Sequence, residues 1–150
     1  MFKIILVTSL AVSTLAIVGC STTYHSTQQQ KNLNLLQNKT WIMTQIGATE
    51  YKTNPNTHNA PSLYFGTDLQ LNGADGCNRL VGNYAVKNHQ ISFGPLVSSE
   101  MLCMNSEELS TKYKQALNKV TAYQVYDQTL RLLDQYGNVL LKYETATLAQ

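Results

Sequence analysis

The sequence lacks the motifs that mark the common enzyme classes. It contains no P-loop, no glycine-rich dinucleotide fingerprint and no G-x-S-x-G elbow. The three histidines, His25, His58 and His89, have no metal-ligand spacing to one another. The adjacent Glu107 and Glu108 are explained by the start of a helix rather than by an acid–base pair. We therefore expect a non-enzymatic protein with no cofactor and no metal.

Charge is also scarce. Charged residues make up 13% of the 150 residues, and the formal net charge is only +2. There is no basic patch, because Lys112, Lys114 and Lys119 fall on one predicted helix and form a solvated face. A nucleic-acid partner is therefore not expected. The many Asn, Gln, Ser and Thr residues are typical of an extracytoplasmic, β-rich protein with a neutral polar surface.

No apolar run is long enough to span a bilayer comfortably, which takes about 20 residues. The longest run follows Lys3 and ends near Val18, with serine and threonine inside it, which indicates a secretory signal. The ending Ile-Val-Gly-Cys resembles a bacterial lipobox, so we expect residues 1–19 to be removed and Cys20 to be acylated. An ordinary cleaved secretory signal with a free Cys20 is the alternative. Ser21, by resemblance to Gram-negative lipoproteins, favours the outer membrane without defining the leaflet.

The segment after Cys20 is expected to connect a membrane anchor to a folded domain. Two acyl chains suffice for stable anchoring. Residues 20–35 form the predicted lipidated N-terminus and polar linker, and residues 36–150 the predicted domain. Ser21 to Lys39 shows little periodicity, which predicts a flexible coil with a reach of about 25 Å.

Two cysteines remain once the N-terminal one is assigned to the anchor. In an oxidising compartment Cys77 and Cys103 are expected to pair, which in the chain-entropy model contributes about 3.5 kcal/mol. Cu(I) binding by Cys103 with Met101 and Met104 is an alternative. A nucleophile–base pair of Cys77 and His89 is another, although an oxidised Cys77 would be inert.

Alternating apolar segments between turn-forming residues predict an antiparallel sheet. One amphipathic helix interrupts them, with Asn105 as its expected cap and Glu108 three residues later. The connections are too short for parallel crossovers, so the expected class is α+β. The predicted strands cover residues 40–46, 62–65, 68–71, 80–86, 90–93, 122–126, 130–133 and 139–143.

The segment from Gly76 to Tyr84, GCNRLVGNY, resembles the GCNxxxGxY signature of the META/HslJ domain family. Further matches follow in the family's order: Trp41 in the first strand, Leu63-Tyr64-Phe65, Ile91-Ser92-Phe93-Gly94-Pro95, Ser99 to Cys103, and the closing hairpin. The resemblance covers roughly Leu36 to Tyr143. Ser99 stands where the family usually has threonine, which keeps the hydroxyl.

The resemblance implies a curled antiparallel β-sheet, a half-barrel, packed around a single α-helix. It supplies no catalytic mechanism. The family includes small envelope lipoproteins and a heat-inducible protein, so we expect a membrane-anchored lipoprotein acting through contacts with an unidentified envelope protein, in stress tolerance or assembly. Binding of a lipid or small hydrophobic molecule between sheet and helix is the alternative.

The signature itself has a structural explanation. Gly76 and Gly82 permit turn or bulge geometry, and Asn78 bonds nearby backbone in a turn. Arg79 is expected to pair with Asp75 or Glu100. The competing interpretation is a binding site made by Asp75, Asn78 and Arg79.

Overall fold

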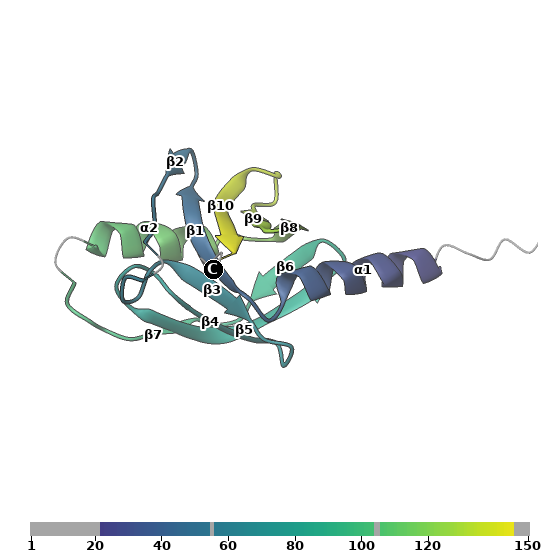
Figure 1. Ribbon diagram of the computed structural model, residues 1–150, viewed down its shortest axis with the longest axis horizontal. Helices are drawn as coiled ribbons and strands as arrows, with labels where there is room; N and C mark the ends of the chain where they lie inside the picture. Colours follow the sequence, from purple (N-terminus) through teal and green to yellow (C-terminus); the bar gives the residue numbers. More distant parts are fainter. Residues whose placement is uncertain (1–21, 55, 104–105, 146–150) are drawn as a thin grey trace, which may run out of the picture.

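Eight antiparallel strands close into a β-barrel in the computed structural model, which describes residues 22–54, 56–103 and 106–145, with side chains from residue 27 onward (Figure 1). The order around the barrel is β1-β3-β4-β5-β6-β8-β9-β10, and β10 pairs with β1 to complete the ring. The ring strands are β1 (Thr40–Ile46), β3 (Ser62–Phe65), β4 (Gln70–Ala74), β5 (Arg79–Lys87), β6 (Gln90–Phe93), β8 (Ala122–Tyr126), β9 (Thr129–Leu133) and β10 (Val139–Thr145).

Two further strands are short and lie outside the ring. Strand β2 (Thr49–Glu50) pairs with β1, and β7 (Val97–Ser98) pairs with the first half of β5. The second half of β5 pairs with β6. Among the described strands, none pairs with the other edge of β7.

The expected half-barrel around a single helix is wrong. The described protein is mostly β, the barrel is closed, and it carries two helices, α1 (Thr22–Leu36) and α2 (Glu107–Leu117). Closure depends on β1 and β10, where Met43 lies opposite Tyr143. Alternation within a strand shows that the strand exists, but it does not show that the first and last strands meet.

Helix α1 differs from the flexible coil expected for the linker. Its exposed face carries amide pairs one turn apart, Gln28 to Asn32 and Gln30 to Asn34, each at 3.0 Å, which favour a helix. Its last residue, Leu36, is buried in the core, and the Trp41 indole N–H donates to the Leu36 carbonyl at 2.8 Å. In the part of the chain that the structure describes, neither helix is both long and apolar enough to cross a membrane. The predicted signal and Cys20 lie outside the described residues.

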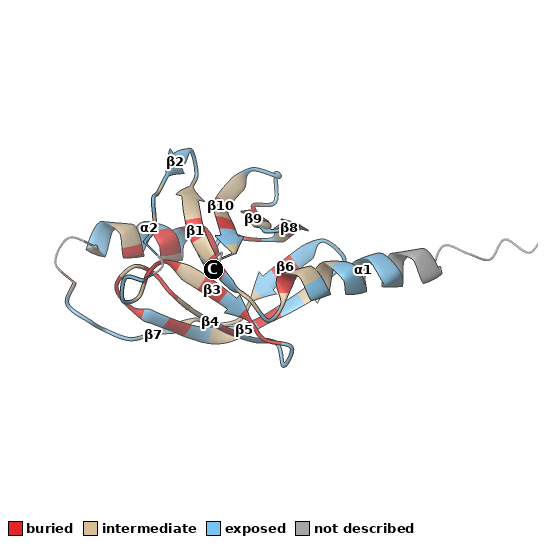
Figure 2. Ribbon diagram, viewed as in Figure 1, coloured by how far each residue is buried: buried red, intermediate tan, exposed pale blue. Residues whose placement is uncertain are grey.

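The barrel interior is filled by large side chains. Buried and exposed residues alternate along the strands, as expected for a sheet with one face in the core (Figure 2). Helix α2 adds Tyr113 and Leu117 to this core. Its N-cap position is Ser106, whereas the predicted cap, Asn105, lies outside the described residues. The fully buried side chains of greatest volume are Trp41, Tyr113, Tyr123, Tyr143, Phe65, Leu36, Met43, Leu63, Leu71, Leu80, Ile91 and Leu117.

Because of four tyrosines in its core, the folded protein is expected to lose stability at alkaline pH. Burial raises the pKa of Tyr84, Tyr113, Tyr123 and Tyr143 above the ordinary value of 10.0. Tyr143 and Tyr113 share a hydrogen bond of 2.9 Å between their hydroxyls. In the unfolded chain these groups ionise near pH 10, whereas in the native state they stay neutral. Their contribution to stability is therefore complete below pH 10 and declines as the pH rises above it.

A tyrosinate absorbance titration, followed in parallel by circular dichroism, checks this. We expect the last phenols to ionise together with unfolding, and the double variant Tyr113→Phe/Tyr143→Phe to show a shallower alkaline decline. Ionisation of all nine tyrosines while the native circular dichroism persists would contradict the prediction.

Candidate functional site

The GCN segment forms a tight turn organised by Asp75. The Asp75 side chain is fully buried, and its Oδ1 accepts the backbone N–H groups of Cys77 at 2.9 Å and Asn78 at 2.7 Å. The Asp75 N–H donates in turn to the Asn78 carbonyl at 3.0 Å. Gly76 has a φ of +97°, a conformation that L side chains rarely adopt. A buried aspartate and a glycine thus fix the backbone between β4 and β5.

The second oxygen of Asp75 reaches helix α2. Its Oδ2 accepts the Ser110 hydroxyl at 2.7 Å and lies 3.7 Å from the Lys114 ammonium. Ser110 is buried, whereas the Lys114 side chain is partly exposed. One carboxylate therefore holds the turn together and fastens the helix to it.

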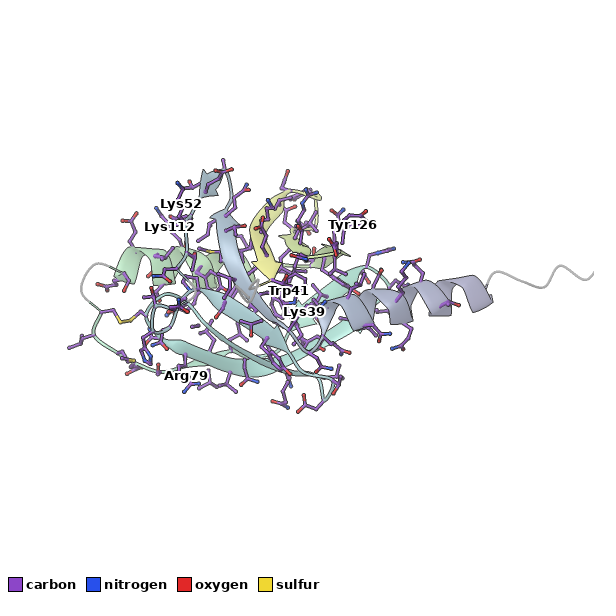
Figure 3. The ribbon with its side chains drawn as sticks, in the orientation of Figure 1. Lys39, Trp41, Lys52, Arg79, Lys112 and Tyr126 are labelled. Atoms are coloured by element: carbon purple, nitrogen blue, oxygen red, sulfur yellow. A yellow bond between two sulfur atoms is a disulfide. The ribbon has the colours of Figure 1, made fainter. Side chains whose placement is uncertain are left out.

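Asn78 and the disulfide hold the segment that follows β7. The Asn78 Oδ1 accepts the Met101 backbone N–H at 2.8 Å, and the Ser99 hydroxyl lies 3.4 Å from the same oxygen. Cys77 and Cys103 are joined by a disulfide, with their Cα atoms 5.8 Å apart. The bond is the yellow link near the start of α2 in Figure 3. The chain from Ser99 to Cys103 is thus attached to the turn at both ends.

The Arg79 side chain takes no part in the contacts that Asp75 and Asn78 make. It is exposed, and among the described residues it forms no ion pair. The predicted pairing of Arg79 with Asp75 or Glu100 is therefore wrong. The Arg79 backbone N–H donates to the Ser99 hydroxyl at 3.1 Å. Figure 3 shows Arg79 and Lys112 on separate parts of the molecule. With Asp75 and Asn78 engaged in backbone contacts, the geometry favours a structural role for the signature.

The described residues bring together no three His, Cys, Asp or Glu side chains that could hold a metal ion. His58 lies in the loop before β3, and His89 in the turn between β5 and β6. Because Cys77 and Cys103 are bonded to each other, neither thiol is free for the copper site or for the nucleophile considered from the sequence. Met104 lies outside the described residues.

Sequence comparison gives the family. The family model of the META domain matches residues 34–147. The chain belongs to the META domain family. The matched range includes the last turn of α1, which agrees with the burial of Leu36 in the META-domain core. No curated protein matches the chain.

Solved structures share the fold of this META domain. One protein structure determined by NMR superposes with a TM-score of 0.60 at 21% identity, covering 78% of this chain and 97% of that one. An NMR structure of a protein from Burkholderia xenovorans gives 0.59 at 24% identity, covering 93% and 99%. The crystal structure of a DUF4847 family protein from Bacteroides vulgatus gives 0.56 at 14% identity, covering 75% and 95%. At these identities the likeness shows the fold alone.

The META domain carries a hollow beside Asp75, Asn78 and Ser110, which we call the Asp75 cluster. This hollow, which we call the α2 groove, has a volume of about 800 Å³. One wall is the chain from Ser98 to Cys103, and the other is formed by residues of α2. The groove was not expected from the sequence, because the contacts of Asp75 with Ser110 and of Asn78 with Met101 join residues far apart in the chain. The α2 residues that line it are Glu107, Glu108, Ser110, Thr111 and Lys114.

Proposed function

We propose that this META-domain protein is a non-enzymatic lipoprotein of the bacterial envelope, anchored to the outer membrane through Cys20, and that it binds another envelope protein in stress tolerance or assembly. The anchor rests on the lipobox-like sequence before Cys20. The disulfide between Cys77 and Cys103 is consistent with an oxidising compartment such as the periplasm. The non-enzymatic role is supported by the site chemistry, since the buried Asp75 accepts three hydrogen bonds that hold the turn and the helix.

The filled barrel is the observation that favours protein contacts over cargo binding. A lipid or small apolar ligand needs a largely preformed apolar space. The barrel interior instead holds Trp41, Tyr113 and Tyr143, each with no exposed surface. Large apolar side chains also face solvent, including Leu102 and Val97. Binding is therefore proposed for the outer surface.

A second candidate function, binding of a lipid or small hydrophobic molecule, has one observation in its favour. A hollow of about 330 Å³ lies between β6 and the chain after α2. Its lining includes Val86, Ile91 and Val120. The pairing of β6 with β8 is the shortest between neighbouring strands of the barrel, with Gln90 opposite Ala122.

A photo-crosslinking residue placed at position 102 in intact host cells tests the protein-binding proposal. Leu102 is fully exposed at the groove, and Tyr136, 81% exposed in the turn before β10, is the matched control position. We expect one reproducible protein adduct from position 102 and none from position 136. Absence of an adduct, or the same adduct from both positions, would contradict it.

Two further measurements complete the test. Native mass spectrometry of the purified protein, offered a membrane lipid extract, is expected to show no lipid adduct beyond the acyl anchor, and a stoichiometric non-covalent adduct would favour the second candidate. Cys20→Ser is expected to move the protein from the membrane fraction to the soluble fraction. Unchanged membrane association of that variant would overturn the anchor.

A further inference from the structure

The α2 groove has the form of a site for an extended peptide. It lies between a strand and a helix, and its volume of about 800 Å³ is within the usual range of ligand clefts, roughly 300–1,000 Å³. Its strand-side wall is fixed in place by the disulfide and by the Met101 N–H bond to Asn78. A groove whose walls are already positioned requires little ordering when it binds.

The strand side of the groove has an edge, on β7, with which none of the described strands pairs. Val97 lies opposite Val81 in the antiparallel register, and the Ser99 N–H donates to the Arg79 carbonyl at 3.1 Å. Peptide groups of alternate residues point to opposite sides of a strand, so the N–H and C=O of Ser98 point away from β5. Ser98 also lines the groove. Unpaired edges of this kind accept an added strand from another chain.

The charges around the groove favour a basic occupant. Three glutamates line it, and Lys114 is its basic residue among the described residues. Lys114 faces Asp75 at 3.7 Å, and Glu108 is paired with Lys112 at 2.6 Å. Among the described residues, Glu100 and Glu107 are left without an ion-pair partner. The exposed side chains of Met101 and Leu102 add apolar contact area at the rim.

We propose that the α2 groove binds an extended, basic segment of a partner protein, which adds to the free edge of β7 and places lysine or arginine side chains near Glu100 and Glu107. This inference rests on the proposed protein-binding function and names its site and the chemistry of its partner. The backbone bonds at Ser98 provide strand pairing, and the glutamates select for positive charge. Binding should weaken as the ionic strength rises, because the glutamates are exposed to solvent.

Fluorescence anisotropy with labelled synthetic peptides tests the proposal on the full chain in nonionic detergent. The first probe is a heptapeptide in which lysine alternates with valine. The second replaces lysine by glutamate, and the third keeps the lysines but carries N-methylated backbone amides, which cannot form a strand ladder. We expect saturable binding of the first probe alone. Equal binding of the first and third probes would overturn strand addition, and equal binding of the first and second would overturn the charge selection.

Variants that replace glutamate by glutamine remove the negative charge and keep the shape of the side chain, so they test where the peptide binds. Glu100→Gln combined with Glu107→Gln is expected to weaken binding of the lysine peptide about tenfold at low salt. The matched control is Glu50→Gln, an exposed glutamate on β2 outside the groove. The control should leave the affinity unchanged. Equal affinities in the double variant and the unaltered protein would overturn the assignment.

The peptide result and the cell result separate the two proposals. If the lysine peptide fails to bind while position 102 still yields its adduct in cells, the basic-strand inference fails and the protein-binding function stands. If neither peptide binding nor an adduct is found, both fail. A benzophenone on the peptide should attach to residues 98–103 or to α2, and attachment elsewhere would contradict the inference.

Discussion

Asp75→Ala is expected to lower the free energy of unfolding by about 3–5 kcal/mol. The carboxylate is fully buried and accepts three hydrogen bonds, from the backbone of Cys77 and Asn78 and from the Ser110 hydroxyl. Removing it leaves these donors without an acceptor, at about 1–3 kcal/mol for each unsatisfied buried group. The carboxylate's own desolvation cost offsets part of this loss. Urea unfolding followed by circular dichroism measures the change.

Asp134→Ala is the matched control for this prediction. Asp134 also accepts two backbone N–H groups, those of Tyr136 and Asn138, each at 2.9 Å, but it lies in an exposed turn. Because water can replace an exposed acceptor, its removal should cost far less than removal of Asp75. Asp75→Asn should lose an intermediate amount, since its amide oxygen still accepts the two turn N–H groups. Similar losses at positions 75 and 134 would show that the Asp75 cluster does not fasten α2.

The elements that the sequence predicted well are those specified by neighbouring residues. The first strand, Thr40–Ile46, is confirmed with the same bounds. The two hairpins β5–β6 and β9–β10 are confirmed as well. In the first hairpin, Asn88 takes a φ of 58°, a conformation that asparagine tolerates better than most residues. Alternation and turn chemistry act over a few residues, and they can be recognised in a single chain.

The features that the sequence did not predict depend on residues far apart in the chain. Barrel closure requires Met43 to lie beside Tyr143, and nothing in either strand indicates the other. The Asp75 contact to Ser110 spans 35 positions and joins a turn to a helix face. A buried serine on an otherwise apolar helix face was the available signal, since a buried hydroxyl needs a partner. The α2 groove could not be predicted from the sequence for the same reason, because the contacts of Asp75 and Asn78 beside it join residues far apart in the chain.

Replacing both Cys77 and Cys103 by alanine is the second substitution expected to lower the free energy of unfolding strongly. The disulfide spans 26 positions, and in the chain-entropy model closing such a loop contributes about 3.5 kcal/mol by restricting the unfolded chain. The double variant should therefore lose about that free energy of unfolding and melt roughly 10 °C lower. Alanine is preferred to serine because Cys77 is 5% exposed, and a serine hydroxyl there would need a buried partner. Denaturant unfolding with and without reductant gives the measurement.

Reductant separates the bond from other effects of the substitutions. It should destabilise the unaltered protein by nearly the same amount as the double substitution, and it should leave the double variant unchanged. Cys20→Ser is the matched control, because it removes the third cysteine and leaves the bond intact, so it should keep the full response to reductant. If reductant has no effect on the unaltered protein, the bond does not form in solution. The attachment of residues 99–103 would then rest on Asn78 and Ser99 alone, and the double substitution should cost little.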